Sequence, residues 1–311
     1  MNSGNAEIVK PIAVKRSIKR WRDVRERLIE LLLFCAAASS VAVTLGIVTI
    51  LVTESLPFFS HVSIKEFLTG TEWTPMFAEA RFGILPLLCG TLLTTAIALM
   101  LAIPMGTIIA IFLSEYMPAR WREMTKPVLE LLAAVPTVVY GYFALLFVTP
   151  LLQKLMPNLS GFNVLSAGIV IGIMIVPYIT SLSEDAMRAV PAFLREGSYA
   201  MGATRMQTAF RVVVPAGFSG LTSAYILGIS RALGETMVVA IAAGMQPNLT
   251  VDPTQPAATI TAFIVQVSMG DLPHGSIGYQ SIYVAGLTLL CLTLTFNLIG
   301  FAIRKRFREV Y

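Results

Sequence analysis

The sequence predicts an all-α integral membrane protein with six transmembrane helices. Hydrophobic residues make up 56% of the 311 residues and charged residues only 13%, against about 25% charged in soluble domains. Mean hydropathy is +0.75. A spanning helix needs about 20 mostly apolar residues, and six stretches meet this requirement. They are residues 28–52, 83–113, 128–151, 164–182, 217–243 and 282–303.

The basic residues indicate how these spans are oriented. Segment 1–27 is rich in Lys and Arg and has an amphipathic pattern, and short positively charged segments stay on the cytoplasmic side. This rule places both termini, including the tail 307–311, in the cytoplasm, and it makes residues 55–82 a periplasmic cap segment. Topology and anionic lipids account for the basic residues, so the net charge of +5 does not indicate a nucleic-acid partner.

The first three spans each raise a question of structure. Residues 28–54 read as an uncleaved transmembrane helix, because the apolar run is longer than the 7 to 15 residues of a signal peptide. The second span contains Pro104 and Gly106, and the third contains Pro136 and Gly141. Both spans are expected to be long and either tilted or bent. Their Pro and Gly residues would be explained either by a position along a transport pathway or by helix packing alone.

The fifth span contains two opposite charges, Arg231 and Glu235, within the run "GISRALGETMVVAIAAG". One charge at the centre of a span costs about 2.5 to 3.5 kcal/mol. Positions i and i+4 share a helix face, so the two side chains are expected to pair and face the protein interior. Either the pair only stabilises the helix, or the two charges take part in the function of the protein.

The longest cytoplasmic connection, residues 190–220, predicts two short helices that meet at Gly202. Pro191 suits a helix start, and Gly202 suits a left-handed cap. Thr204 and Gln207 have the spacing of a capping box, and Pro215 ends the second piece. A short helix pair held at a fixed angle offers a surface that a partner could bind.

The same connection resembles the EAA loop of ABC importer permeases. Glu196 lies six residues before Gly202, and "VVVP" ends at Pro215, whereas Gly197 and Ser198 replace the two alanines of the family pattern. In that family the loop inserts into a groove of the ATP-binding subunit. The resemblance implies a coupling loop at 190–216 within a permease core at 83–306. Its coupling residues would be Glu196, Gly202, Ala203, Thr204 and Pro215.

Other stretches narrow the resemblance to the PstC family, the phosphate permease subunits of bacterial importers. They are "EFLTGTEWTPMF", "FGILPLLCGTLLTT", "ELLAAVPTVVYGY", "LREGSYAMGATRMQ" and "RALGETM". The resemblance covers about residues 65–306. It implies a type I ABC importer permease (MetI-like) fold in the bacterial inner membrane and ATP-driven, high-affinity import of inorganic phosphate. Arg231 and Glu235 would lie on the substrate pathway. There Arg231 would exchange Glu235 for phosphate, because the guanidinium fork matches phosphate oxygens.

The resemblance also implies partners. They are a second permease subunit (PstA), two ATP-binding subunits (PstB), and a periplasmic phosphate-binding protein (PstS) that docks on the outer surface, here residues 55–82 and 246–278. The sequence contains no G-x-x-x-x-G-K-[ST] motif, so the chain is expected to bind no cofactor itself, with ATP and Mg on the partner ATPase.

The remaining chemistry-bearing residues do not predict an enzyme. His61 and His274 are far apart in sequence, no nucleophile arrangement is found, and the three cysteines lie in apolar spans, where packing explains them. An ion-gradient-driven secondary transporter or channel for an anion is the main alternative function. A membrane scaffold or sensor is a second alternative. The EAA-like loop argues against both, because neither needs a rigid cytoplasmic docking element.

Overall fold

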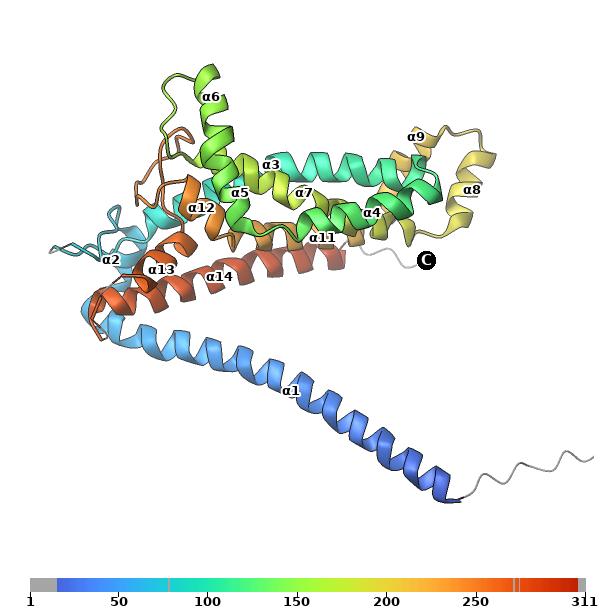
Figure 1. The fold of residues 1–311 in the computed structure, drawn as a ribbon, viewed down its shortest axis with the longest axis horizontal. Helices are drawn as coiled ribbons and strands as arrows, with labels where there is room; N and C mark the ends of the chain where they lie inside the picture. Colours follow the sequence, from blue (N-terminus) through green and yellow to red (C-terminus); the bar gives the residue numbers. More distant parts are fainter. Residues whose placement is uncertain (1–15, 78, 271, 274, 307–311) are drawn as a thin grey trace, which may run out of the picture. The chain divides into compact units, whose positions relative to one another are not determined.

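The computed structural model describes residues 16–77, 79–270, 272–273 and 275–306, and within these ranges it is helical apart from two isolated β-bridges (Figure 1). Residues 1–15 of the basic N-terminal segment, His274 and the tail 307–311 lie outside the described residues. The chain divides into two units, residues 1–50 and 51–311.

The first unit consists of most of helix α1 (Arg16–His61). Its side chains from Trp21 to Ile50 are almost all exposed, and none of its most apolar 18-residue window is buried. A helix stretch that is apolar all round is suited to contact lipid or another protein surface. The predicted first span lies within this single helix.

The second unit contains the end of α1 and all later helices. These are α2 (Ile64–Thr69), α3 (Leu85–Ile111), η1 (Phe112–Tyr116), α4 (Ala119–Ala133), α5 (Thr137–Phe143), η2 (Ala144–Val148), α6 (Thr149–Leu155), α7 (Val164–Arg188), α8 (Ala192–Ala200), α9 (Arg205–Thr208), η3 (Ala209–Val213), α10 (Val214–Ala216), α11 (Phe218–Leu233), α12 (Met237–Ala242), α13 (Ile260–Ser268) and α14 (Ile277–Arg306). The three η segments are π-helical turns.

Helices α3, α7, α11 and α14 are neighbours in that order and form the body of the second unit (Figure 1). Small residues allow their close approach. A Cβ at Gly168 of α7 would fall 2.7 Å from Ile97 Cγ2 of α3, and one at Gly172 would fall 2.8 Å from the Ala98 carbonyl oxygen. A continuous core of small and branched side chains therefore lies between α3 and α7, and α12 packs against it.

Five helices of the described residues are long and apolar enough to cross a membrane, by length and composition. A sixth span is counted if α11 and the short helices before it, which meet at Gly217 with a bend of 74°, are taken together. Pro104 does not interrupt α3, which continues to Tyr116 through η1. The all-helical membrane fold predicted from the sequence is confirmed.

Two predicted span boundaries are wrong. The third span begins at Thr137 and not at residue 128, because Pro136 cannot continue the preceding helix and α4 ends at Ala133. The fifth predicted span, 217–243, is divided at Gly234 into α11 and α12.

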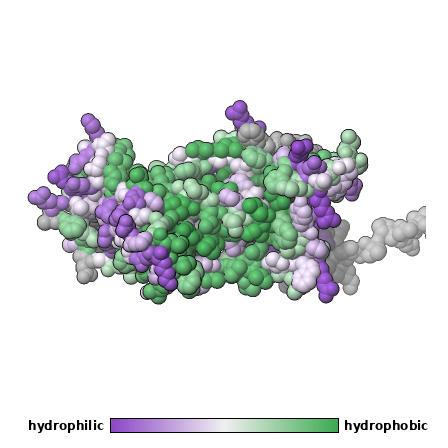
Figure 2. Space-filling model, turned by 90° about the horizontal axis from the view of Figure 1, so that it is seen from above, coloured by the Kyte–Doolittle hydropathy of each residue, from purple (hydrophilic) through white to green (hydrophobic). Residues whose placement is uncertain are grey.

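The two ends of the long helices differ in their packing. At one end, Phe58, Phe82 and Trp73 are buried with α2 and α13 in an aromatic cluster, and the rings of Trp73 and Phe263 lie 5.0 Å apart. At the other end, α8 and α9 project beyond α3 and α4 (Figure 1). Figure 2 shows one face of the molecule, on which hydrophobic residues fill a central band between two hydrophilic ends.

Candidate translocation site and coupling loop

A helix break separates Arg231 from Glu235. α11 ends at Leu233, where the N–H of Gly234 donates to the Ser230 carbonyl and that of Glu235 to the Ala232 carbonyl. The next helix, α12, starts at Met237. The prediction that the two charges share one helix face is therefore wrong, and no ion pair joins them among the described residues.

Glu235 is held by backbone groups on the far side of this break. Its side-chain Oε1 accepts hydrogen bonds from the N–H groups of Met237 (3.1 Å) and Val238 (3.2 Å). Its own carbonyl accepts one from the Thr261 hydroxyl of α13 (2.8 Å). The residue is 7% exposed. A carboxylate at this position satisfies N–H groups that have no partner within α12 and is stabilised by the dipole of the helix start.

Arg231, in contrast, has no carboxylate partner within the described part of the chain. It is half-buried in the last turn of α11, and its guanidinium lies 5.8 Å from the centre of the Tyr178 ring on α7. Its buried Nε makes no hydrogen bond. An unsatisfied buried donor on a charged group is costly. Within the described residues, the guanidinium is thus a cation whose charge no carboxylate neutralises.

The described residues cover the face of α11 that carries Arg231 only in part. Leu227 and Gly234 are exposed, and Ser230 and Arg231 are half-buried, at a spacing that places all four on one face. Ser230 donates to the Oδ1 atom of Asn297 (3.2 Å), an exposed amide within the apolar helix α14. Polar groups at such depth in a span normally face a cavity or another protein surface.

The predicted coupling loop, residues 190–216, has the local structure that its sequence predicts. Gly202 adopts φ +81°, in the left-handed region, and follows α8. Thr204 and Gln207 form both hydrogen bonds of a capping box at the start of α9 (3.3 and 2.9 Å). Glu196, Thr204 and Pro215 are exposed, and Ala203 is half-buried. Pro215 lies two residues before the bend at Gly217, so it does not itself end the helix.

A clamp that the sequence did not reveal connects this loop to the long helices. Arg195 of α8 donates to both carboxylate oxygens of Glu115 in η1, at 3.0 to 3.3 Å. It also donates to the carbonyls of Met187 (2.8 Å) and Val190 (2.7 Å), at and just beyond the end of α7. The Glu115 side chain is only 3% exposed. One side chain thus joins α8, η1 and α7.

A second charge cluster joins α4 to α7. Glu184 of α7 is 2% exposed and lies 3.0 Å from Lys126 Nζ, 3.8 Å from Arg122 Nε and 3.7 Å from Arg188 Nη1. Lys126 also pairs with Asp185. Burial alone would lower the pKa of Lys126, but its hydrogen bonds to Asp185 and Glu184 and their negative charges raise it above its ordinary value. Both clusters lie at the end of the molecule that carries the coupling loop.

These features define the class of protein. A bundle of apolar helices with a partly covered face and a rigid, capped helix pair at one end is the architecture of a permease subunit of an ABC importer. Residues 102–309 match the family described as "Binding-protein-dependent transport system inner membrane component", and the chain belongs to that family.

Relatives of similar length support this assignment. The chain is 35% identical over 303 residues to the "Probable ABC transporter permease protein YqgH" of Bacillus subtilis, with 96% of each chain covered. It is 34% identical to the "Phosphate transport system permease protein PstC" of Mesorhizobium japonicum, with 86% of each covered. A probable PstC of Methanocaldococcus jannaschii is 32% identical, covering 82% of this chain and 86% of that protein.

Solved structures show the same fold. A chain of a bacterial ABC transporter that imports the polysaccharide alginate superimposes with a TM-score of 0.63 at 14% identity, covering 94% of this chain and 100% of that one. A chain of the inward-facing MetNI methionine transporter superimposes with a TM-score of 0.53 at 17% identity, covering 73% and 95%. The MetI-like permease fold is confirmed.

Family membership settles several points. The protein is a PstC-type permease subunit of an ABC importer in the inner membrane, it is not itself catalytic, and ATP is hydrolysed on partner subunits. A periplasmic binding protein belongs to such a system. The secondary transporter and the scaffold are therefore set aside.

Proposed function

We propose that the chain is the permease subunit of an ATP-driven, high-affinity importer of inorganic phosphate and forms half of its translocation pathway. Several relatives with good coverage are named phosphate transport system permease proteins, which supports phosphate as the substrate. The observation that carries the proposal is the state of Arg231. It is a half-buried guanidinium in the last turn of α11, without a carboxylate partner among the described residues and on a helix face that they cover only in part.

Arg231 is suited to replace part of the hydration shell of phosphate. Its planar fork can donate two parallel hydrogen bonds to an oxyanion, which a Lys ammonium cannot do. Tyr178 lies beside the guanidinium and neutral Ser230 precedes it, so neither neutralises its charge. A contact of this kind need not be tight, because an ion that is held too strongly does not leave a pathway.

Glu235 belongs to the same pathway with a different role. In this conformation it caps the start of α12 and does not hold Arg231. We infer that it fixes the break between α11 and α12 next to Arg231 and keeps a negative charge near the passing anion. Such a charge weakens anion binding at Arg231, which favours release.

The coupling loop, residues 190–216, transmits the movement of the ATPase. Glu196 is exposed, and no atom lies within 4 Å of a Cβ placed at Gly202, so the surface is open to a partner groove. Gly202, Ala203 and Thr204 set the angle between α8 and α9, and Pro215 precedes the bend that leads into α11. The Arg195 clamp connects the loop to η1 and α7.

The assembly consists of this chain, a PstA-type permease, two PstB-type ATPases that bind ATP and Mg, and a PstS-type receptor. We place both termini in the cytoplasm, because segment 1–27 and the end of α14, Arg304 to Arg306, are both basic and short basic segments stay on that side. The receptor would dock at the opposite end, where residues 73–77 share a small cavity with Met245, Pro247, Phe263 and Gln266.

The proposal is tested by ATP-driven uptake of labelled phosphate into vesicles that contain the complete complex, with sulfate as competitor. Wild type is compared with Arg231→Ala, and assembly and basal ATPase activity are measured on the same samples. We expect Arg231→Ala to abolish uptake while assembly and basal ATPase activity remain. Uptake of sulfate instead of phosphate would refute the substrate, and unchanged phosphate uptake would return Arg231 to a structural role.

A further inference from the structure

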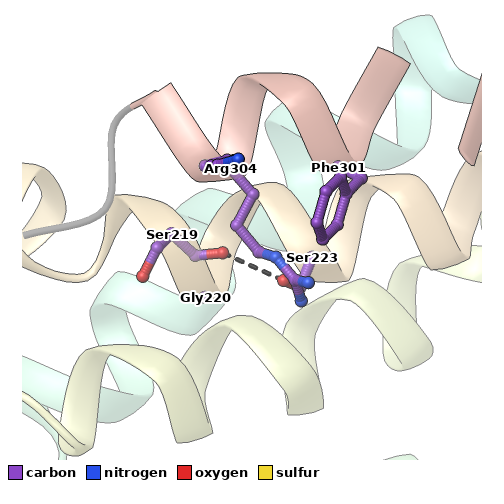
Figure 3. Close-up of a pocket in the computed structure, with 6 residues that line it drawn as sticks. Ser219, Gly220, Ser223, Phe301 and Arg304 are labelled. Atoms are coloured by element: carbon purple, nitrogen blue, oxygen red, sulfur yellow. Dashed lines mark hydrogen bonds between the residues drawn. The ribbon is translucent and has the colours of Figure 1, made fainter. Parts of the chain in front are cut away.

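A cavity of about 530 Å³ lies between the start of α11 and the end of α14 (Figure 3). Ser219, Gly220 and Ser223 line it from α11, and Phe301, Arg304 and Lys305 line it from α14. Its volume is within the range of small-molecule sites, about 300 to 1,000 Å³. None of the roles proposed above uses these residues.

The lining is basic and offers hydrogen-bond donors. Arg304 extends from α14 toward Ser223, and its guanidinium lies 5.4 Å from the centre of the Phe301 ring (Figure 3). Ser223 donates to the Ser219 carbonyl (3.0 Å), and within the described residues the Ser219 hydroxyl has no partner. Neither Arg304 nor Lys305 forms an ion pair with a described carboxylate. Among the described residues, two cations without a carboxylate partner and a hydroxyl without a hydrogen bond therefore face one cavity.

The cavity lies on the side of α11 that also carries Ser230, the residue before Arg231. On α11, Ser219, Ser223 and Ser230 are spaced so that they share a helix face. On α14, Asn297, Phe301 and Arg304 do the same, and the bond from Ser230 to Asn297 shows that the two faces meet. A rise of about 1.5 Å per residue puts Ser219 about 18 Å along α11 from Arg231.

We propose that this cavity binds a phosphate group, with Arg304 as the main ligand and Lys305, Ser219 and Ser223 as additional donors. The start of α11 also favours an anion through its helix dipole. The phosphate group has two possible sources, inorganic phosphate leaving the pathway or the headgroup of an anionic phospholipid. In the first case the cavity binds the transported ion as it leaves the pathway, and this case rests on the proposed function. In the second case the bound lipid anchors α14 to the leaflet.

The test uses the assembled membrane complex without its receptor, carrying Arg231→Ala so that the central site contributes nothing. One arm measures binding of labelled inorganic phosphate by equilibrium dialysis in nanodiscs of phosphatidylcholine. The other measures retention of phosphatidylglycerol by native mass spectrometry. Each arm compares Arg304→Gln with Arg306→Gln, which removes the same charge from the same helix end but does not line the cavity.

We expect Arg304→Gln to lower the affinity for one of the two ligands by about tenfold, and Arg306→Gln to lower it by less than about threefold. General attraction of the basic surface for an anion is similar for both charges, so a difference between the variants reports the cavity itself. The double variant Ser219→Ala with Ser223→Ala should weaken the same ligand without changing any charge. Loss in the first arm identifies inorganic phosphate, and loss in the second identifies the lipid. Equal effects of the two Arg variants, or no binding in either arm, would overturn the proposal. Because binding is read without transport, this result is independent of the uptake assay.

Discussion

Arg195 and Glu115, 80 positions apart in the sequence, form a forked ion pair in which the guanidinium also binds the carbonyls of Met187 and Val190. The pair ties the first helix of the coupling loop to a π-helical turn and to the C-terminal end of α7. A force applied to α8 would therefore reach α3 and α7 directly.

Replacing one member of this pair should lower the stability of the protein more than replacing both. Arg195→Ala leaves the Glu115 carboxylate buried without a cation, and such a loss typically costs about 3 to 5 kcal/mol. The double variant Arg195→Ala with Glu115→Ala removes that uncompensated charge and should recover part of the loss. Unfolding of the purified complex measures the stability, and phosphate transported per ATP hydrolysed measures the coupling. Additive effects of the two single changes would contradict a direct pair.

Lys126→Met should weaken the packing of α4 against α7, and the resulting loss of stability should not depend on pH near neutrality. The lysine bonds to Glu184 and Asp185, and we expect a loss of about 1 to 3 kcal/mol of stability. Since the folded state raises the pKa of Lys126 above its ordinary 10.5, its contribution is full below that value and is lost as the pH rises through the folded pKa. The difference between wild type and variant should therefore stay constant from about pH 6 to 9. A difference that changed across this range would assign the effect to another group.

Gly202→Ala should destabilise the coupling loop through backbone strain alone. Gly202 has φ +81°, and no atom lies within 4 Å of the added Cβ, so the expected loss is about 1 to 2 kcal/mol. Gly197→Ala is the matched control, because its Cβ also meets nothing within 4 Å and its φ is not positive. In the interior of α8 an alanine should gain up to about 1 kcal/mol. Stability and ATPase stimulation by substrate are measured for both, and equal behaviour would argue against a left-handed requirement.

Arg231→Lys keeps the charge and removes the planar fork. If the fork contacts phosphate, the variant should transport with a lower maximal rate or a weaker apparent affinity, although the span still carries one cation. Initial rates of uptake over a range of phosphate concentrations give both quantities. Normal transport with unchanged affinity would rule out a bidentate contact. Arg231 would then act on the anion only through the electrostatic effect of its charge.

Two substitutions at Glu235 separate its charge from its cap. Glu235→Gln retains an oxygen that can accept from Met237 and Val238 but is neutral, whereas Glu235→Ala loses the hydrogen bonds as well, at about 1 to 2 kcal/mol. We expect both to impair uptake and only the Ala variant to lower the thermal stability. Normal uptake by the Gln variant would assign Glu235 a purely structural role.

Local structure was the part that could be predicted from the sequence. The capping box at Thr204 and the left-handed Gly202 depend on residues only a few positions apart, so their sequence spacing is sufficient. The apolar runs likewise predicted the spans by their length. The division of the fifth run was missed because its hydropathy was read as one unit, although Gly234 followed by Glu235 and Thr236 contains the stop and cap residues that mark a helix boundary.

Contacts between distant segments could not be predicted in this way. The pair of Arg195 with Glu115 and the cluster around Glu184 depend on how α3, α4, α7 and α8 pack, which no spacing in a single sequence gives. Both acidic residues lie at the ends of helices, where a charge is unremarkable until its burial is known. Asn297 was hidden by the apolar run around it, although an amide within a span is itself a signal.

The π-helical turns η2 and η3, which lie between α5 and α6 and between α9 and α10, have a consequence for how such permeases diverge. A π turn holds one more residue than the α-helical turn on either side, and such turns are frequent at functional sites. A single-residue insertion or deletion can be absorbed there without rotating the rest of the helix. Length differences among related chains should therefore collect at these turns, while the faces that carry Gly168, Gly172 and Arg231 keep their register.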